Sequence, residues 1–374
     1  MLLQFEVRGF KGFCDPFRWN LASRDYTFNN RMVRGKIVSK AIVLDESRPG
    51  KEELRLALFD IYYHLIDGSD IPDTYLHDYL STAKLTREAV FRYTFQFDRD
   101  VVIYEYAKRN ASKLIYEKIW LNGTQVLDTD VKISGKTYRS VSATLYKGPE
   151  LHPDPAFPSF VDQIYQALPE DDDSPLTKMV RFIEGMAQYE SLTTAGLLRS
   201  EKHLAQLESQ LIAGGSAFLS SFESFLAANG YPFHLSVLPG TTALGYADNQ
   251  EKPLPFSRSA PFATRELLLF FLWTRRAFGE IRFLYVEDFD TVCFGRSAET
   301  ILDTLFEQRG VQMVIVTHNT HLIRNDLVRP DAVFLRRDNR MVPLYQTVTK
   351  EIRVAQNLEK MYWDGTFDTS ESSS

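Results

Sequence analysis

The stretch that decides the fold is Ile281 to Ile323, which reads IRFLYVEDFDTVCFGRSAETILDTLFEQRGVQMVIVTHNTHLI. Two apolar segments in it end in polar residues, Glu287-Asp288 after the first and Thr317-His318-Asn319 after the second. Apolar runs separated by a helix predict two buried strands of one parallel sheet. The carboxylates and the histidine then lie at the carboxyl edge of that sheet, where nucleotide-binding α/β folds bind phosphate.

A second unit of this kind lies far upstream. Residues 41–44 read as an apolar strand, residues 45–51 follow as DESRPGK, and residues 52–65 then have helical spacing. A strand, a loop ending in Gly-Lys and a helix are the layout of a phosphate-binding loop. The sequence therefore predicts an α/β fold with a phosphate-loop-like core.

The loop departs from the usual G-x-x-x-x-G-K-[ST] pattern, because only Gly50 and Lys51 fit it. Asp45 stands where the first glycine belongs, and Glu52 stands where the magnesium-binding hydroxyl belongs. A phosphate loop aims backbone N–H groups at an anion, so nearby carboxylates oppose it, and Pro49 removes one donor. We expect anionic nucleotide to bind badly here. An ordinary strand-to-helix connection with an incidental Gly-Lys stays open as the alternative.

Composition and charge limit the class of protein to which the chain can belong. The chain has 374 residues, of which 44% are hydrophobic, enough for one large α/β domain with insertions or for two lobes. A net charge of -6 excludes non-specific nucleic-acid binding by the chain as a whole and leaves a local basic patch open. Cys14 and Cys293 have no metal-ligand spacing, and the longest apolar run, Leu267 to Trp273, is too short to span a bilayer. We expect a cytoplasmic protein with no membrane contact.

The rest of the chain divides into three predicted segments. Residues 1–150 form a β lobe that carries the altered phosphate loop, residues 151–230 a helical arm or lid, and residues 231–374 a C-terminal lobe. The β lobe begins with a hairpin and continues as an antiparallel meander, with strands expected at Phe91–Phe97, Val101–Ala107, Lys113–Leu121 and Gln125–Lys132. Helical spacing covers residues 175–229, residues 266–278 and residues 351–363.

Together these segments resemble the ABC-type ATPase heads of the RecF/SMC and OLD-like superfamily. They are most similar to the AAA-type ATPases of bacterial anti-phage operons, which stand beside a separate nuclease or other effector. The resemblance covers nearly the whole chain and implies an ABC-ATPase head: a mixed β lobe, a parallel phosphate-loop-like core and a short helical arm. The segments that carry it are Leu56–Ile61, Thr264-Arg265, Phe289-Asp290, Thr317–Thr320, Asn325–Asp331 and Asn357–Tyr362.

The resemblance implies roles for residues around the nucleotide. Lys51 matches the lysine that contacts the β and γ phosphates, with Gly50 before it, and Glu287 matches the Walker B aspartate that orients magnesium. Asp288 matches the glutamate that polarises the attacking water. Asp288 is one methylene shorter than that base, and a shift of about 1 Å can cost on the order of a hundredfold in rate. His318 matches the switch histidine that senses the γ-phosphate.

The resemblance also implies sites that meet a second subunit. Asp290 lies where the dimer-facing D-loop begins, and Thr264 and Arg265 fall in the signature region that faces nucleotide. The serine and glycine of the family's signature are here Pro261 and Ala263. Family members form dimers or larger rings, but this change removes the groups by which nucleotide joins two heads. Any oligomer of this chain then needs another interface.

Three functions follow as hypotheses. The first is a pseudo-ATPase that scaffolds, senses or restrains a protein effector in anti-phage defence, with weak or absent ATP turnover. The second is a slow ATPase that uses Lys51, Glu287 and Asp288 and dimerises around nucleotide to license an effector nuclease. The third is a nuclease that holds a metal on Glu287, Asp288 and Asp290. ATP and Mg²⁺ are the cofactors that the resemblance implies, and the altered motifs count against both.

Overall fold

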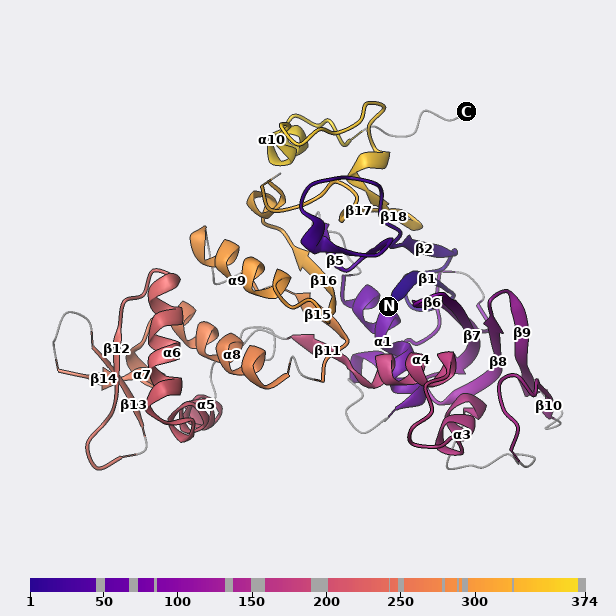
Figure 1. Ribbon diagram of the computed structural model, residues 1–374, viewed down its shortest axis with the longest axis horizontal. Helices are drawn as coiled ribbons and strands as arrows, with labels where there is room; N and C mark the ends of the chain where they lie inside the picture. The colour runs from indigo at the N-terminus through magenta and orange to yellow at the C-terminus, as the bar shows by residue number, and fades with distance from the viewer. Residues whose placement is uncertain are drawn as a thin grey trace.

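One long mixed sheet organises the chain (Figure 1). The computed structural model describes residues 1–44, 51–66, 73–83, 86–131, 137–148, 159–189, 201–241, 243–247, 252–277, 280–287, 289–290, 295–324 and 326–368. In these residues, thirteen strands form a sheet with the order β10-β9-β8-β7-β6-β1-β2-β18-β17-β5-β16-β15-β11. The first seven strands in this order are antiparallel neighbours, and the last five are parallel neighbours.

The antiparallel half is the predicted β lobe. Its strands are β1 (Leu2–Arg8), β2 (Phe17–Asn20), β6 (Ala89–Phe97), β7 (Asp100–Asn110), β8 (Lys113–Leu121), β9 (Thr124–Val131) and β10 (Thr137–Val141). Asn122 and Gly123 both have positive φ and close the β8–β9 hairpin, as the Asn-Gly dipeptide indicates. The β lobe predicted from alternating apolar residues is thus confirmed.

The parallel half is the predicted core. It contains β5 (Lys40–Leu44), β11 (Met186–Tyr189), β15 (Phe283–Glu287), β16 (Gln312–Thr317) and β17 (Val333–Arg337), and β18 (Arg340–Pro343) links β17 to β2. Strands β5, β15 and β16 are buried on both faces, which explains their continuous apolar sequences. The predicted α/β fold class, a mixed β lobe joined to a parallel core, is confirmed.

Helices and two small sheets cover this sheet and extend it. The helices are α1 (Lys51–Leu65), α2 (Asp73–Leu76), α3 (Phe160–Gln166), α4 (Pro175–Glu184), α5 (Glu201–Ala213), α6 (Gly215–Ala228), α7 (Phe256–Ser259), α8 (Phe262–Ala277), α9 (Arg296–Phe306) and α10 (Leu358–Trp363). Strands β12 (His234–Val237), β13 (Leu244–Ala247) and β14 (Leu254–Pro255) form one small sheet, and β3 (Val33–Arg34) with β4 (Ile37–Val38) forms the other. In Figure 1, α5 to α8 and β12 to β14 lie to the left of the core, whereas α3 and α4 lie against the β lobe.

Two helical expectations were wrong in part. Within residues 175–229, Met186–Tyr189 forms strand β11, because pairing with β15 outweighs the local preference of four residues. Within residues 351–363, only Leu358–Trp363 is helical, because the Asn357 side chain accepts a hydrogen bond from the N–H of Lys360 and begins the helix there. The division at residues 150 and 230 stays a prediction. Across the described part of the chain, the helices are too short or too polar to cross a membrane.

A buried carboxylate joins α1 to the β lobe. Asp60 on α1 is fully buried and accepts hydrogen bonds from the hydroxyls of Tyr75 (2.7 Å), Tyr79 (2.7 Å) and Tyr106 (2.8 Å). The ammonium group of Lys108 lies 3.0 Å from the same carboxylate, and its burial lowers the pKa of Lys108. Four donors thus compensate the removal of this carboxylate from water.

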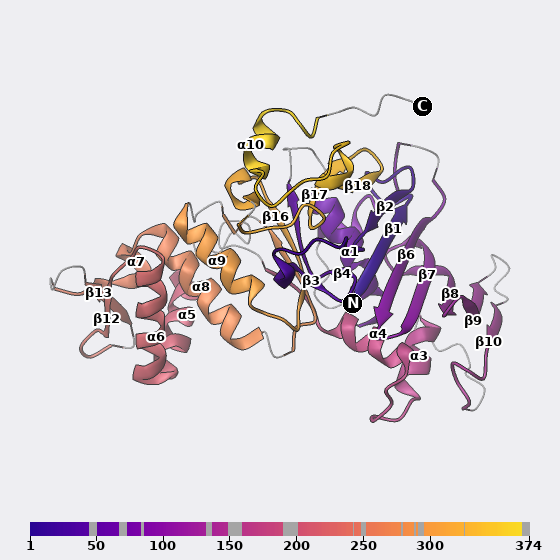
Figure 2. The ribbon, with the colours of Figure 1, turned by 45° about the horizontal axis from the view of Figure 1, so that its top comes forward.

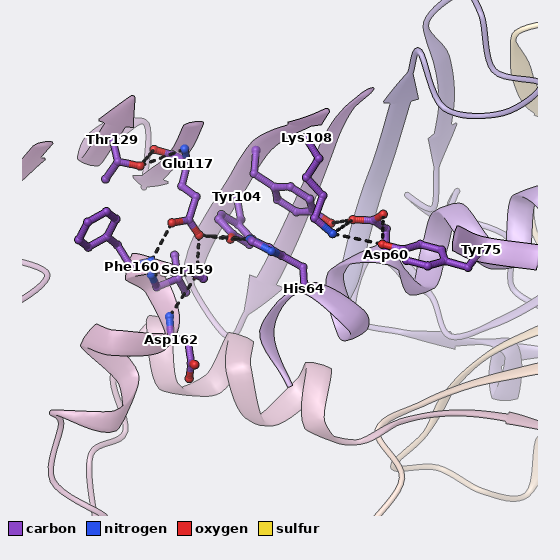
Figure 3. A network of polar contacts seen from close by, with 12 residues as sticks. Asp60, His64, Tyr75, Tyr104, Lys108, Glu117, Thr129, Ser159, Phe160 and Asp162 are labelled. Carbon is purple, nitrogen blue, oxygen red and sulfur yellow. Dashed lines mark hydrogen bonds and ion pairs between the residues drawn. The ribbon is translucent and has the colours of Figure 1, made fainter. Parts of the chain in front are cut away.

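A second buried carboxylate continues the network along the same helix face (Figure 3). His64, one turn after Asp60, contacts the Tyr104 hydroxyl at 2.9 Å and Glu117 at 3.3 Å. Glu117 also accepts hydrogen bonds from Tyr104, from Ser159 and from the N–H of Phe160. Burial lowers the pKa of His64, so its ring is neutral at pH 7. Burial alone would raise the pKa of Glu117, but its hydrogen bonds outweigh burial and hold that pKa below the usual value.

Lys108→Met should lower the free energy of unfolding by about 3–5 kcal/mol, because Asp60 then keeps its charge in the core without a cation. Lys118→Met on β8 is the matched control, since its ion pair with Asp128 is about one-third exposed on both sides. The control should cost less than about 1 kcal/mol. Urea denaturation measures both, and equal losses would contradict the role given to Lys108.

Acid should destabilise the protein in two steps. His64 is neutral when folded and takes up a proton on unfolding below its ordinary pKa of 6.5, so stability falls as pH drops from there. Glu117 is ionised when folded, so its contribution is lost below its ordinary pKa of 4.5. His64→Gln should remove the first step, up to about 1.4 kcal/mol per pH unit. Urea denaturation at several pH values checks this, and an unchanged slope between pH 6.5 and pH 5 would count against it.

Candidate functional site

The carboxyl ends of three core strands meet at one edge. In register, Leu44 at the end of β5 lies opposite Thr317 at the end of β16, and Val316 lies opposite Glu287 at the end of β15. Strand β16 therefore separates the predicted phosphate loop from Glu287. The structure thus brings Glu287 and the Thr317-His318 segment to the same edge, as the sequence indicates.

Three of the candidate residues fall wholly or partly outside the structure's description. Gly50, with the rest of residues 45–50, and Asp288 lie outside the described residues. Lys51 is the first residue of α1, and its backbone alone is described. The roles predicted for these three residues stay predictions.

The guanidinium of Arg55 spans the elements at this edge. Its Nη1 donates to the Gln188 side chain on β11 at 2.7 Å, and its Nε lies 3.8 Å from the Glu287 carboxylate. Its Nη2 lies 3.6 Å from Glu52, the residue at the hydroxyl position of the phosphate-loop pattern. Arg55 and Glu287 are each 12% exposed. One cation from α1 thus faces two carboxylates, that of Glu52 on its own helix and that of Glu287 at the end of β15.

This arrangement fits a divalent cation poorly. Mg²⁺ takes near-octahedral geometry and is usually held by one or two carboxylates together with waters and substrate phosphates. The described residues contain no group of three histidine, cysteine, aspartate or glutamate side chains that could hold a metal. Glu287, which the sequence marks as the metal ligand, already faces the guanidinium of Arg55. A metal at Glu287 would have to compete with that internal cation.

Asp290 points into the protein. It is 7% exposed, and its carboxylate accepts a hydrogen bond of 2.5 Å from the Thr317 hydroxyl. The N–H of Asn319 in turn donates to that hydroxyl at 2.9 Å. Asp290 therefore ties the segment after β15 to the end of β16. The prediction that it borders a second subunit is untested.

His318 is the exposed residue of this segment. It follows Thr317 directly, and its side chain lies at the surface of the sheet edge. The side chain of Asn319 then accepts a hydrogen bond from the N–H of His321 and begins the short helix Thr320–Ile323. His318 is thus placed where it could meet a ligand, and its sensing role stays a prediction.

Thr264 and Arg265 make local contacts at the beginning of α8. The Thr264 hydroxyl donates to the carbonyl of Pro261 at 2.7 Å, and Arg265 donates to the carbonyl of Ser257 in α7 at 3.3 Å. Glu266, the next residue, accepts a hydrogen bond from Tyr189 at the end of β11. The described contacts of Thr264 and Arg265 are thus with their own segment, and their predicted nucleotide contact is untested.

Sequence reasoning missed Arg55 and Gln188. A signal for Arg55 was present, because Lys51 and Arg55 are four residues apart on a helix and so share a face. A cation on the lysine's face of α1 has to lie near the sheet edge. Gln188 carried no such signal, because its strand was expected to be helical.

Comparisons with known proteins concern the fold alone. No protein-family model and no curated protein matches the chain. The chain is similar to three solved SMC heads, and each likeness covers 91% of this chain. The SMC head domain from Thermotoga maritima is 13% identical with a TM-score of 0.41 over 98% of that chain, and the SmcHead bound to the C-winged helix domain of ScpA is 12% identical with a TM-score of 0.45 over 97% of that chain. The Smc head domain with an extended coiled coil bound to the C-terminal domain of ScpA derived from Pyrococcus furiosus is 11% identical with a TM-score of 0.44 over 94% of that chain. At these values the likeness says nothing of activity or ligands.

A double-mutant cycle on Arg55→Met and Glu287→Gln should give a coupling energy of about 1 kcal/mol, because the pair is mostly buried. The exposed pair of Arg31 and Asp303 serves as control, and there we expect less than about 0.5 kcal/mol. Urea denaturation of the variants measures both cycles. A coupling at Arg55 no larger than the control's would refute a counter-ion role for Arg55.

Proposed function

We propose that this chain is a degenerate ABC-type ATPase head that turns over ATP weakly or not at all and acts as a scaffold, sensor or restraint for a protein effector. The observation that carries the proposal is the pairing of Arg55 with Glu287 and Glu52. An internal cation takes the electrostatic place that a nucleotide's metal would need at this edge. The setting in bacterial anti-phage defence rests on the resemblance of the sequence.

The composition of the loop supports the same conclusion. Asp45, Glu46 and Glu52 bring three carboxylates to the segment that would surround the nucleotide's phosphates. Like charges at close range repel. Lys51 supplies one compensating charge, whereas a nucleotide adds several negative charges. Bound ATP would therefore raise the excess of negative charge at this edge.

An exposed aromatic residue near the edge supports a protein partner. Trp363 on α10 is 71% exposed, and its indole N–H donates to the Thr320 hydroxyl, in the segment that follows His318. A tryptophan fixed at the surface by one hydrogen bond is typical of interface anchors. A partner bound at Trp363 would lie next to the sheet edge, where its contacts can respond to the state of His318.

Calorimetric titration with ATP and Mg²⁺ tests the proposal on the wild type, on Lys51→Ala and on the surface control Lys113→Ala. We expect the three proteins to give the same heats, because the altered loop does not hold nucleotide through Lys51. A coupled assay on the same proteins should show no difference in phosphate release. Heat or turnover that Lys51→Ala alone abolishes would refute the proposal and favour the slow ATPase with Lys51, Glu287 and Asp288.

A further inference from the structure

A basic cleft lies at the opposite edge of the parallel core. Its volume is about 580 Å³, and it lies where the core strands begin, because Arg282 comes directly before β15 and Gly310 shortly before β16. The hairpin β3–β4 and helix α4 form its other walls, and Figure 2 shows both beside the N-terminus. The cleft is thus separated from the Arg55 edge by the length of the core strands.

The cleft is positive in a negative protein. Five basic side chains line it, Arg34, Lys36, Lys178, Arg181 and Arg282, together with the two acidic residues Asp98 and Asp173. Five positive and two negative charges give the lining of the cleft a net charge of +3. Because the whole chain carries -6, the rest of the chain carries -9. Burial lowers the pKa of the Met1 amine to about 5, so that group adds no charge at pH 7.

Both acidic residues of the cleft face one lysine. Lys178 lies 3.1 Å from Asp173 and 3.7 Å from Asp98, so its charge is compensated. Four further basic residues, Arg34, Lys36, Arg181 and Arg282, line the same cleft. These four residues come from three separate elements, the β3–β4 turn, α4 and the beginning of β15, and they meet at one cavity. All four are exposed to solvent, so a ligand can reach them.

Arginine side chains in a concave site favour phosphate. A guanidinium offers two parallel N–H donors that match phosphate oxygens, which an ammonium does not. The cavity volume lies in the range of sites for small ligands. Phe97 and Phe182, whose ring centroids are 6.3 Å apart, add an apolar wall beside the charges. Charge and aromatic surface together suit a molecule that carries both phosphate and a ring.

We propose that this basic cleft binds a small phosphate-bearing ligand of about nucleotide size. A nucleic-acid strand is the less favourable occupant, because it would extend past the cleft and the rest of the chain carries net negative charge. The proposal is independent of the proposed pseudo-ATPase function, since none of the residues around Arg55 lines the cleft. It places ligand binding at the edge where strands begin, whereas the sequence motifs point to the edge where they end.

Calorimetric titration with ATP in the absence of magnesium, and separately with pyrophosphate, tests the cleft. The test variant is Arg181→Gln/Arg282→Gln, and the matched control is Arg8→Gln/Arg18→Gln, which removes the same charge from exposed residues outside the cleft. Saturable binding should weaken at least about tenfold in the test variant and stay unchanged in the control and in Lys51→Ala. All four arginines are exposed, so we expect the variants to fold. Thermal denaturation checks that they do.

Three results would overturn the proposal. The first is no saturable binding of either probe to the wild type. The second is binding that Lys51→Ala abolishes and the cleft variant keeps, which would assign the nucleotide to the opposite edge and refute the pseudo-ATPase proposal as well. The third is equally tight, cleft-dependent binding of a short single-stranded DNA oligonucleotide, which would make the site a nucleic-acid surface.

Discussion

The buried charge of Asp60 is the constraint on which the rest of the structure depends. A carboxylate in the core is tolerated only when donors surround it, and here three tyrosines and Lys108 do so. Those donors come from α2, its following turn and β7, so the β lobe can pack on α1 in one orientation only. The position of α1 in turn fixes where Arg55 meets the ends of β11 and β15.

The two edges of the core have opposite electrostatic character. At the carboxyl edge, the single positive charge of Arg55 faces the two negative charges of Glu52 and Glu287, so no positive charge is in excess there. At the amino edge, five basic and two acidic side chains line the cleft, which gives it a net charge of +3. The proposed anion site thus lies at the end of the core strands opposite the edge that the sequence motifs indicate.

Much of the fold could be predicted because the spacing of apolar residues along the chain indicates its main strands and helices. The alternation in β6 to β9 and the continuous apolar runs of β5, β15 and β16 each specify a strand. The edge positions of Glu287 and Thr317 follow from those runs. Strand β11 could not be predicted in this way, since four residues with no apolar pattern become a strand only by pairing with β15. The basic cleft was equally hidden, because its charges are separated by up to 248 positions from Arg34 to Arg282.

The sequence by itself determined the class of fold, most of its longer strands and the edge at which Glu287 and His318 gather. These depend on the alternation of apolar and polar residues, which acts over a few neighbouring positions. Only the tertiary structure decided that Glu287 is paired with Arg55, that Asp290 turns inward to Thr317, and that arginines from three elements converge at the opposite edge. Charge acts through space and not along the chain, so its balance at a site exists only once distant segments are packed together.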